Sequence, residues 1–138
     1  MQISAHVQNG QGSHLVTVKT GDRSRQLAIP SKADGLGSSI NGGEALFVAL
    51  ATCYCNDIYR EAGKRGIKVR QVEVEVEGEF QAEGQPAQHV SYHARVHAEA
   101  GEQAILDLMR HTDTVAEIHN TLRVGTSVEL KTSEAVSL

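Results

Sequence analysis

The sequence contains no tryptophan, only two prolines and two cysteines, and no long apolar run. A helix that spans a bilayer needs about 20 consecutive apolar residues, so neither a membrane span nor a membrane partner is expected. The first residues also lack the basic start and apolar stretch of a secretory signal. Scarce proline argues against a linker-rich or disordered chain. We therefore expect a folded, cytoplasmic protein.

The two cysteines, Cys53 and Cys55, lie within one apolar stretch. This spacing does not resemble the dispersed cysteines of a secreted disulfide-bonded protein, and we interpret both residues as free thiols. On a helix, side chains two positions apart point in different directions, so these two thiols cannot reach disulfide geometry. A reactive thiol, if there is one, must act without its neighbour.

Lysine and arginine form no cluster, and the formal net charge is −4. A basic patch is the electrostatic footprint of proteins that bind nucleic acid or anionic lipid, so we expect neither partner. A chain of 138 residues with 40% apolar residues can bury a core without disulfides or structural metal. The sequence predicts a single domain over residues 1–138 and indicates no cofactor.

The first half predicts strands followed by one long helix. Short segments alternate around turn residues up to residue 30, and residues 14–19 and 24–29 predict neighbouring strands of an antiparallel meander. Residues 31–43 are rich in glycine and serine and predict a loop. Residues 44–64 predict a helix whose first half is apolar all round, which indicates burial on all sides.

The second half begins with a predicted hairpin. Valine alternates with glutamate over residues 69–80, and a second alternating segment covers residues 90–96. His89, His93 and His97 would lie on one strand, roughly 13 Å from one to the next, which is too far for them to chelate one ion. We expect them to pair across the hairpin with the glutamate row.

Helical spacing returns over residues 101–122, and residues 124–130 predict a last strand. The order is therefore βββ-α-ββ-α-β. Strands and helices that are mixed so unevenly favour the α+β class over a repeated parallel unit.

A thiol reacts as the thiolate, and its pKa falls beside a cation or a helix N-terminus but rises in apolar surroundings. Cys53 would lie about ten residues into its helix, too far from the N-terminus to gain from the dipole. Activation would need a side chain from elsewhere in the fold, for which His111 and His119 are candidates. On residue type alone, Cys53 is equally a buried structural cysteine.

Residues 42–53, GGEALFVALATC, resemble the central-helix signature of the OsmC-like family, relatives of the organic hydroperoxide resistance proteins. The resemblance implies antiparallel strands wrapped around a buried central helix and an intertwined homodimer. It also implies that Cys53 is peroxidatic: the thiol attacks a hydroperoxide, becomes a sulfenic acid and is then reduced by a second thiol.

The sequence departs from the family pattern at three places. Ala116 stands where the family has its second cysteine, which predicts an external thiol reductant. Gly43 stands where the hydroperoxide resistance branch has a carboxylate, so the next residue, Glu44, is either a catalytic residue or only a helix cap. The family's arginine would fall within residues 9–12, where this chain has none.

The sequence is compatible with three functions. The first is reduction of organic hydroperoxides by Cys53, with Glu44 and Tyr54 as supporting residues. The second is a noncatalytic relative whose dimer cleft binds an apolar ligand. The third is a thiol redox sensor in which oxidised Cys53 alters partner binding.

Overall fold

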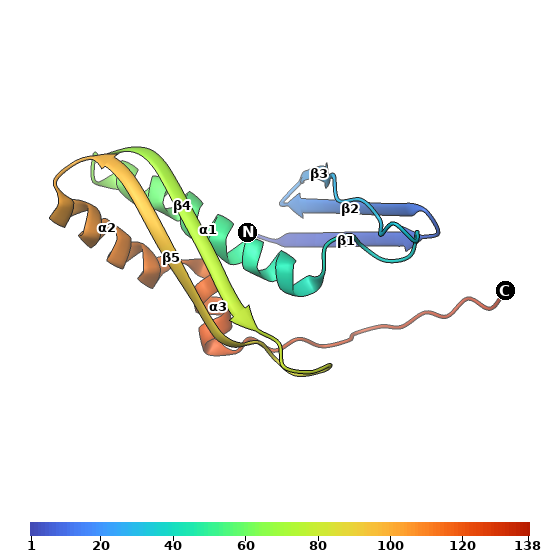
Figure 1. The fold of residues 1–138 in the computed structure, drawn as a ribbon. Helices are drawn as coiled ribbons and strands as arrows, with labels where there is room; N and C mark the ends of the chain where they lie inside the picture. The colour runs from blue at the N-terminus through green and yellow to red at the C-terminus, as the bar shows by residue number, and fades with distance from the viewer. The chain divides into compact units, whose positions relative to one another are not determined.

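The computed structural model describes residues 1–138 and divides them into two compact units, residues 1–46 and 47–138. The first unit contains a three-stranded antiparallel sheet in the order β1-β2-β3 (Figure 1). Its strands are β1 (Ile3–Gly10), β2 (Ser13–Thr20) and β3 (Arg23–Leu27). Register places Val7 opposite Val16, and Val16 opposite Leu27, so apolar side chains share one face. The predicted meander is confirmed.

Helix α1 (Gly42–Lys64) starts with a reciprocal cap. The Asn41 side-chain oxygen accepts a hydrogen bond from the Glu44 amide at 2.7 Å. The Glu44 carboxylate accepts one from the Asn41 amide at 3.0 Å. This is a capping box, in which each side chain satisfies an amide that the first helical turn leaves unpaired. The helix therefore begins two residues earlier than the sequence predicted.

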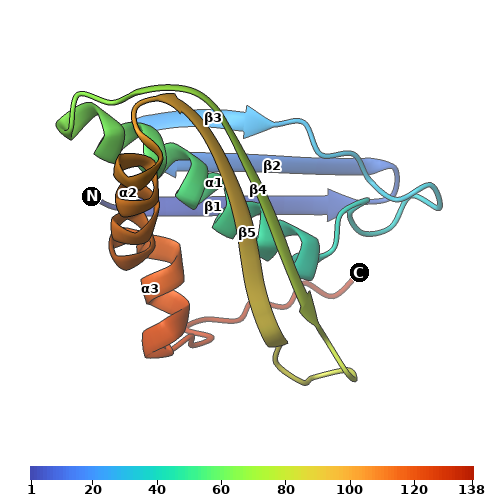
Figure 2. The same cartoon turned by 60° about the vertical axis from the view of Figure 1, so that its left-hand side comes forward.

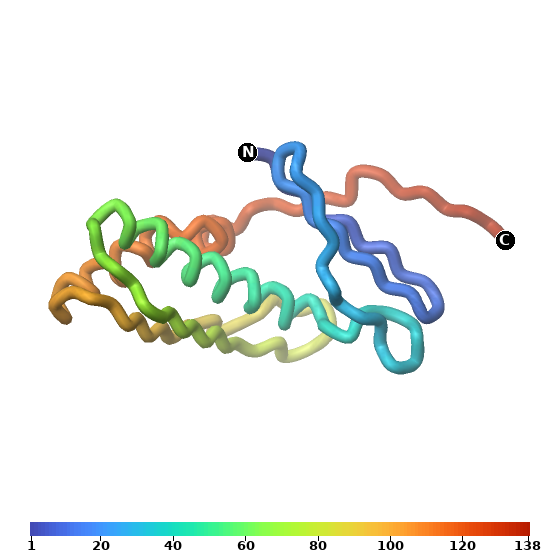
Figure 3. The backbone as a smooth tube through the Cα atoms, turned by 90° about the horizontal axis from the view of Figure 1, so that it is seen from above, coloured from blue at the N-terminus to red at the C-terminus, as the bar shows by residue number.

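In the second unit, β4 (Lys68–Glu79) and β5 (Gln88–Glu99) form an antiparallel hairpin. Helix α1 runs alongside β4 in the opposite direction, and α2 (Glu102–Val115) lies on the same face of the hairpin (Figures 2 and 3). The core comes from these two helices: Tyr54, Ile58, Ala62 and Leu108 are buried against the alternating valines, Ala94 and Tyr92 of the hairpin. The predicted hairpin and its apolar face are confirmed.

The outer face of the hairpin carries the acidic and basic row that the sequence predicted, but the expected pairing is wrong for His97, which lies opposite Gln71 and not opposite a glutamate. Glu75 lies opposite His93, and Glu73 opposite Arg95. His89 Nδ1 lies 3.5 Å from Glu79 Oε1. All these side chains are exposed, so their ion pairs contribute little stability individually.

Burial of α1 on all sides was a wrong expectation. The buried residues of α1, from Leu50 to Ala62, form one face, whereas Val48 and Tyr59 are 57% and 46% exposed. The physical reason is that the hairpin and α2 cover a helix from one side only.

The predicted helix over residues 101–122 is two helices, because Ala116 has an extended backbone with ψ of 112°. The second of them, α3 (Glu117–Val124), ends at Gly125 in a left-handed conformation. The predicted strand over residues 124–130 is wrong: Val124 is helical, and the residues that follow pair with no strand. A strand requires a neighbour for its backbone hydrogen bonds, and alternation alone does not supply one. No helix of the chain is both long and apolar enough to span a membrane.

Candidate functional site

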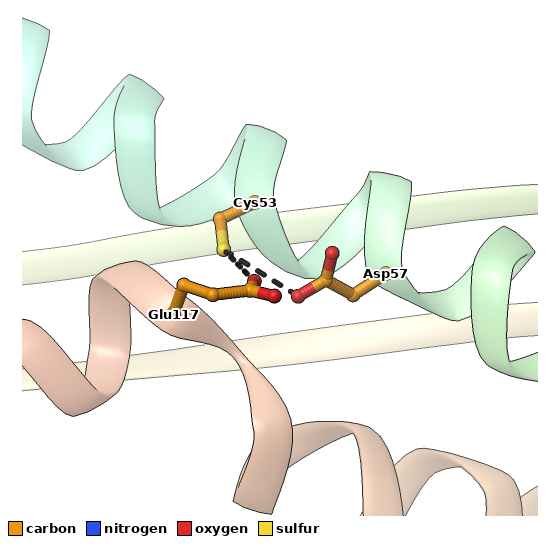
Figure 4. A group of neighbouring side chains, drawn as sticks. All are labelled: Cys53, Asp57 and Glu117. Atoms are coloured by element: carbon orange, nitrogen blue, oxygen red, sulfur yellow. Dashed lines mark hydrogen bonds between the residues drawn. The ribbon is translucent and has the colours of Figure 1, made fainter. Parts of the chain in front are cut away.

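Cys53 is a partly buried residue in the middle of α1, and two carboxyl groups contact its sulfur (Figure 4). Its Sγ lies 3.6 Å from Oδ2 of Asp57 and 3.7 Å from Oε2 of Glu117. Asp57 is four positions further along α1, a spacing that places both side chains on one helix face. Glu117 lies in the first turn of α3.

The break at Ala116 brings Glu117 to the sulfur. If α2 continued without interruption, residue 117 would extend the same helical path; instead the extended backbone of Ala116 redirects the chain into α3. Ala116 itself is fully buried. The backbone of Ile118, the second residue after Ala116, lowers the pKa of the Cys53 thiol. The junction of α2 and α3 therefore forms one wall of the site.

Burial raises the pKa of the Cys53 thiol, and the neighbouring Asp57 and Glu117 raise it further. The Ile118 amide opposes this shift, because an N–H donor stabilises a thiolate. At rest, the site therefore favours the protonated thiol.

The two carboxyl groups differ in their protonation. The Asp57 side chain is only 8% exposed, and burial, followed by a hydrogen bond with Glu117, raises its pKa. The Glu117 side chain is 63% exposed, and hydrogen bonds from its own backbone amide and from Asp57 lower its pKa. A proton shared by the pair therefore resides on Asp57, while Glu117 stays ionised.

Arg60 holds these carboxyl groups together. One of its guanidinium nitrogens, Nη1, lies 2.9 Å from Asp57 Oδ1 and 2.9 Å from Glu117 Oε1. Its Nε lies 2.9 Å from Oε2 of Glu61, a buried residue that Lys64 and His111 also contact. Hydrogen bonds from Lys64 and Arg60 lower the pKa of Glu61 to about 2. A permanent cation is thus fixed beside the carboxyl pair.

The sulfur and the two carboxylate oxygens lie within 4.8 Å of one another, which would suit a cation in spacing. The guanidinium of Arg60 already binds both carboxyl groups and supplies positive charge there. The arrangement therefore fits a proton-sharing cluster better than a metal centre.

The other residues singled out from the sequence lie away from these contacts. The Glu44 carboxylate is engaged in the cap of α1. The Tyr54 hydroxyl donates to the Met109 carbonyl at 2.9 Å, and burial raises its pKa to about 12. His111 contacts Glu61, and the His119 ring lies edge-on against Tyr92. Neither histidine is a hydrogen-bond partner of Cys53.

Cys55 is a partly buried free thiol, as predicted. Sequence reasoning missed Asp57, Arg60 and Glu117. A signal was present for the first two, because charged residues at helical spacing after Cys53 interrupt an otherwise apolar face. Nothing local in the sequence pointed to Glu117.

Comparison with known proteins agrees with this architecture. The model of the OsmC-like protein family matches residues 35–131, which include Cys53 and the α2–α3 junction. Among solved structures, an OsmC-like protein from Mycoplasma pneumoniae superposes with a TM-score of 0.59 at 21% identity, covering 88% of this chain and 86% of that one.

Two further structures carry hydroperoxide resistance in their names. The organic hydroperoxide resistance protein OsmC from Legionella pneumophila has a TM-score of 0.53 at 20% identity, covering 89% of this chain and 90% of its own. An OsmC-like hydroperoxide resistance protein from Jannaschia sp. has a TM-score of 0.56 at 15% identity, covering 96% of this chain and 93% of that one. At these identities the likeness is one of fold. None of the curated proteins matches the sequence.

Proposed function

Because the chain belongs to the OsmC-like family, we propose that it reduces organic hydroperoxides with Cys53 as the reactive thiol. The observation that carries the proposal is the pair of carboxyl groups at the Cys53 sulfur, within the part of the chain that the family matches. Carboxyl groups in contact with a thiol can move the protons that its oxidation requires. Glu44 has its carboxylate in the cap of α1 and takes no step in this reaction.

The oxidised product is the sulfenic acid of Cys53. An external thiol then attacks the sulfenic sulfur, releases water and leaves a mixed disulfide, which a second external thiol reduces. External thiol is required because Ala116 occupies the position of the second thiol, and Cys55 cannot reach Cys53 on the same helix. The homodimer that the family resemblance implies belongs to the same proposal.

One observation favours the noncatalytic alternative, in which the fold binds an apolar ligand and the thiol stays inert. Burial and two neighbouring acidic groups raise the pKa of Cys53, whereas peroxidatic thiols usually have a lowered pKa. A thiol sensor, oxidised selectively but turning over slowly, lies between the two.

Stopped-flow oxidation of the purified protein separates these functions. Cumene hydroperoxide and hydrogen peroxide are mixed in turn with wild type, Cys53→Ser and Cys55→Ser, the last being the matched thiol control. A peroxidase oxidises Cys53 faster with the organic peroxide, and Cys55→Ser keeps that rate. Oxidation at the rate of a free thiol, with no preference for the organic peroxide, would reject the peroxidase function and support the noncatalytic one.

A further inference from the structure

The two carboxyl groups at Cys53 have different surroundings, although they share one cation. The Asp57 side chain is 8% exposed and belongs to the same helix face as the thiol, whereas Glu117 is 63% exposed at the start of α3. Both form ion pairs with Arg60, and both contact the sulfur (Figure 4). Water stabilises the charge of the exposed group and not that of the buried one.

We propose that Asp57 and Glu117 act as an acid–base pair in the reaction of Cys53, with Glu117 accepting the thiol proton and Asp57 donating a proton to the leaving alkoxide. This inference rests on the proposed hydroperoxide reductase function. Two carboxyl groups whose environments assign the proton to one of them are the usual arrangement for such a division of roles.

The proposed step balances in atoms and charge. The Cys53 proton passes to the Glu117 carboxylate, and the sulfur lone pair attacks the terminal oxygen of the hydroperoxide. The S–O bond forms as the O–O bond breaks, so sulfur is oxidised to the sulfenic acid and the hydroperoxide is reduced. The alkoxide takes the Asp57 proton and leaves as the alcohol. The proton on Glu117 then returns to Asp57, because the carboxylate oxygens of the two groups lie within 4.8 Å of each other.

The resting thiol makes such a pair necessary. At neutral pH, a thiol with a raised pKa is almost entirely protonated, and the protonated form is a poor nucleophile. A base in contact with the sulfur removes the proton during attack, so no standing thiolate is needed. The free energy of removing the thiol proton depends on three charged groups around it, which are Asp57 and Arg60 from α1 and Glu117 from α3.

The test is stopped-flow oxidation of full-length protein from pH 5 to pH 9, with cumene hydroperoxide and with peracetic acid. The variants are Asp57→Asn and Glu117→Gln, and the control is Asp107→Asn, an exposed carboxylate on α2. Thermal melts confirm that each variant folds. In wild type, the rate with cumene hydroperoxide should be high where Glu117 is ionised and Asp57 is protonated, and should fall as the pH rises and Asp57 loses its proton.

Glu117→Gln should lower the rate near pH 7 by about 100-fold, the usual contribution of a general base. Its rate should then rise about tenfold per pH unit as thiolate forms. Asp57→Asn should slow the oxidation of Cys53 by cumene hydroperoxide far more than its oxidation by peracetic acid, because acetate leaves without needing a proton. A Glu117→Gln profile like that of wild type, or an Asp57→Asn variant that slows both oxidants equally, would overturn the pair.

The same data distinguish the two levels of the proposal. If wild-type Cys53 reacts no faster than a free thiol, the reductase function fails and the acid–base pair falls with it. If wild type reacts fast and both carboxyl variants keep its rate and profile, the function stands and only the pair is refuted.

Discussion

Glu117 places its carboxylate 3.7 Å from the sulfur of Cys53, although 64 positions separate the two residues in the chain. The contact exists because α2 stops at an extended Ala116 and the chain restarts as α3. The chemistry of the site is thus set at the junction of α2 and α3.

Ala116→Cys should give the protein a resolving thiol. Position 116 is buried and directly precedes Glu117, whose carboxylate contacts the Cys53 sulfur. After one equivalent of cumene hydroperoxide without added thiol, intact mass should show an internal disulfide in this variant. Ala82→Cys, in the turn between β4 and β5, is the control. In that variant Cys53 should remain a sulfenic acid, which dimedone traps. A dimedone adduct at Cys53 in Ala116→Cys would contradict the prediction.

Asn41→Ala should lower the free energy of unfolding by about 1 kcal/mol, since it removes one half of the capping box. Glu44→Gln should be nearly neutral, because an amide oxygen still accepts the Asn41 amide hydrogen bond. Urea denaturation measures both. If Glu44→Gln instead reduced the Cys53 oxidation rate at unchanged stability, Glu44 would be catalytic and not only a cap.

Gly78→Ala should destabilise the second unit by about 1–3 kcal/mol. A Cβ at position 78 would lie 2.8 Å from the Phe47 ring and 3.1 Å from Val90, and Phe47 is itself stacked on Phe80. Gly63→Ala is the matched control, because its Cβ would meet nothing within 4 Å in the last turn of α1. That variant should be more stable than wild type by about 0.5 kcal/mol, so the two substitutions shift the urea midpoint in opposite directions.

The Glu61 network should make stability fall in acid. The folded pKa of about 2 lies below the ordinary value of 4.5, so the unfolded chain binds the proton more readily. The stabilisation is complete above about pH 4.5 and is lost as the pH falls toward 2. Urea midpoints between pH 6 and 2 should converge for wild type and Glu61→Gln. A constant difference across that range would show that the Glu61 charge does not stabilise the fold.

His119→Phe should stabilise the protein below neutral pH. Both ring nitrogens of His119 are buried without hydrogen-bond partners, and the ring packs edge-on against Tyr92. Burial lowers the pKa of His119 below 6.5. The unfolded chain therefore binds the proton first, and wild type loses stability as the pH falls below 6.5. The advantage of the His119→Phe variant over wild type should widen from pH 7 to 5 in thermal melts. The exposed His97→Gln serves as the control, and an advantage independent of pH would refute the titration of His119.

The sequence by itself determined the elements whose signals are local. The alternating valines and glutamates specify the hairpin because side chains of a strand point alternately to two faces, and the structure places the valines against the helices. The apolar run that ends at Cys53 specifies α1 and carries the family resemblance, which the match over residues 35–131 confirms. Pairing of the outer charges followed from the same alternation.

Tertiary structure decided the rest. Alternation over residues 124–130 predicted a strand, but Val124 stayed helical and no neighbour offered hydrogen bonds to the residues after it. Burial of α1 depended on which elements cover it, which its own apolar pattern does not encode. Above all, the break at Ala116 brings Glu117 of α3 to Cys53 of α1. A contact between residues 64 positions apart arises from packing and chain direction, whereas sequence patterns report only neighbours within a few residues.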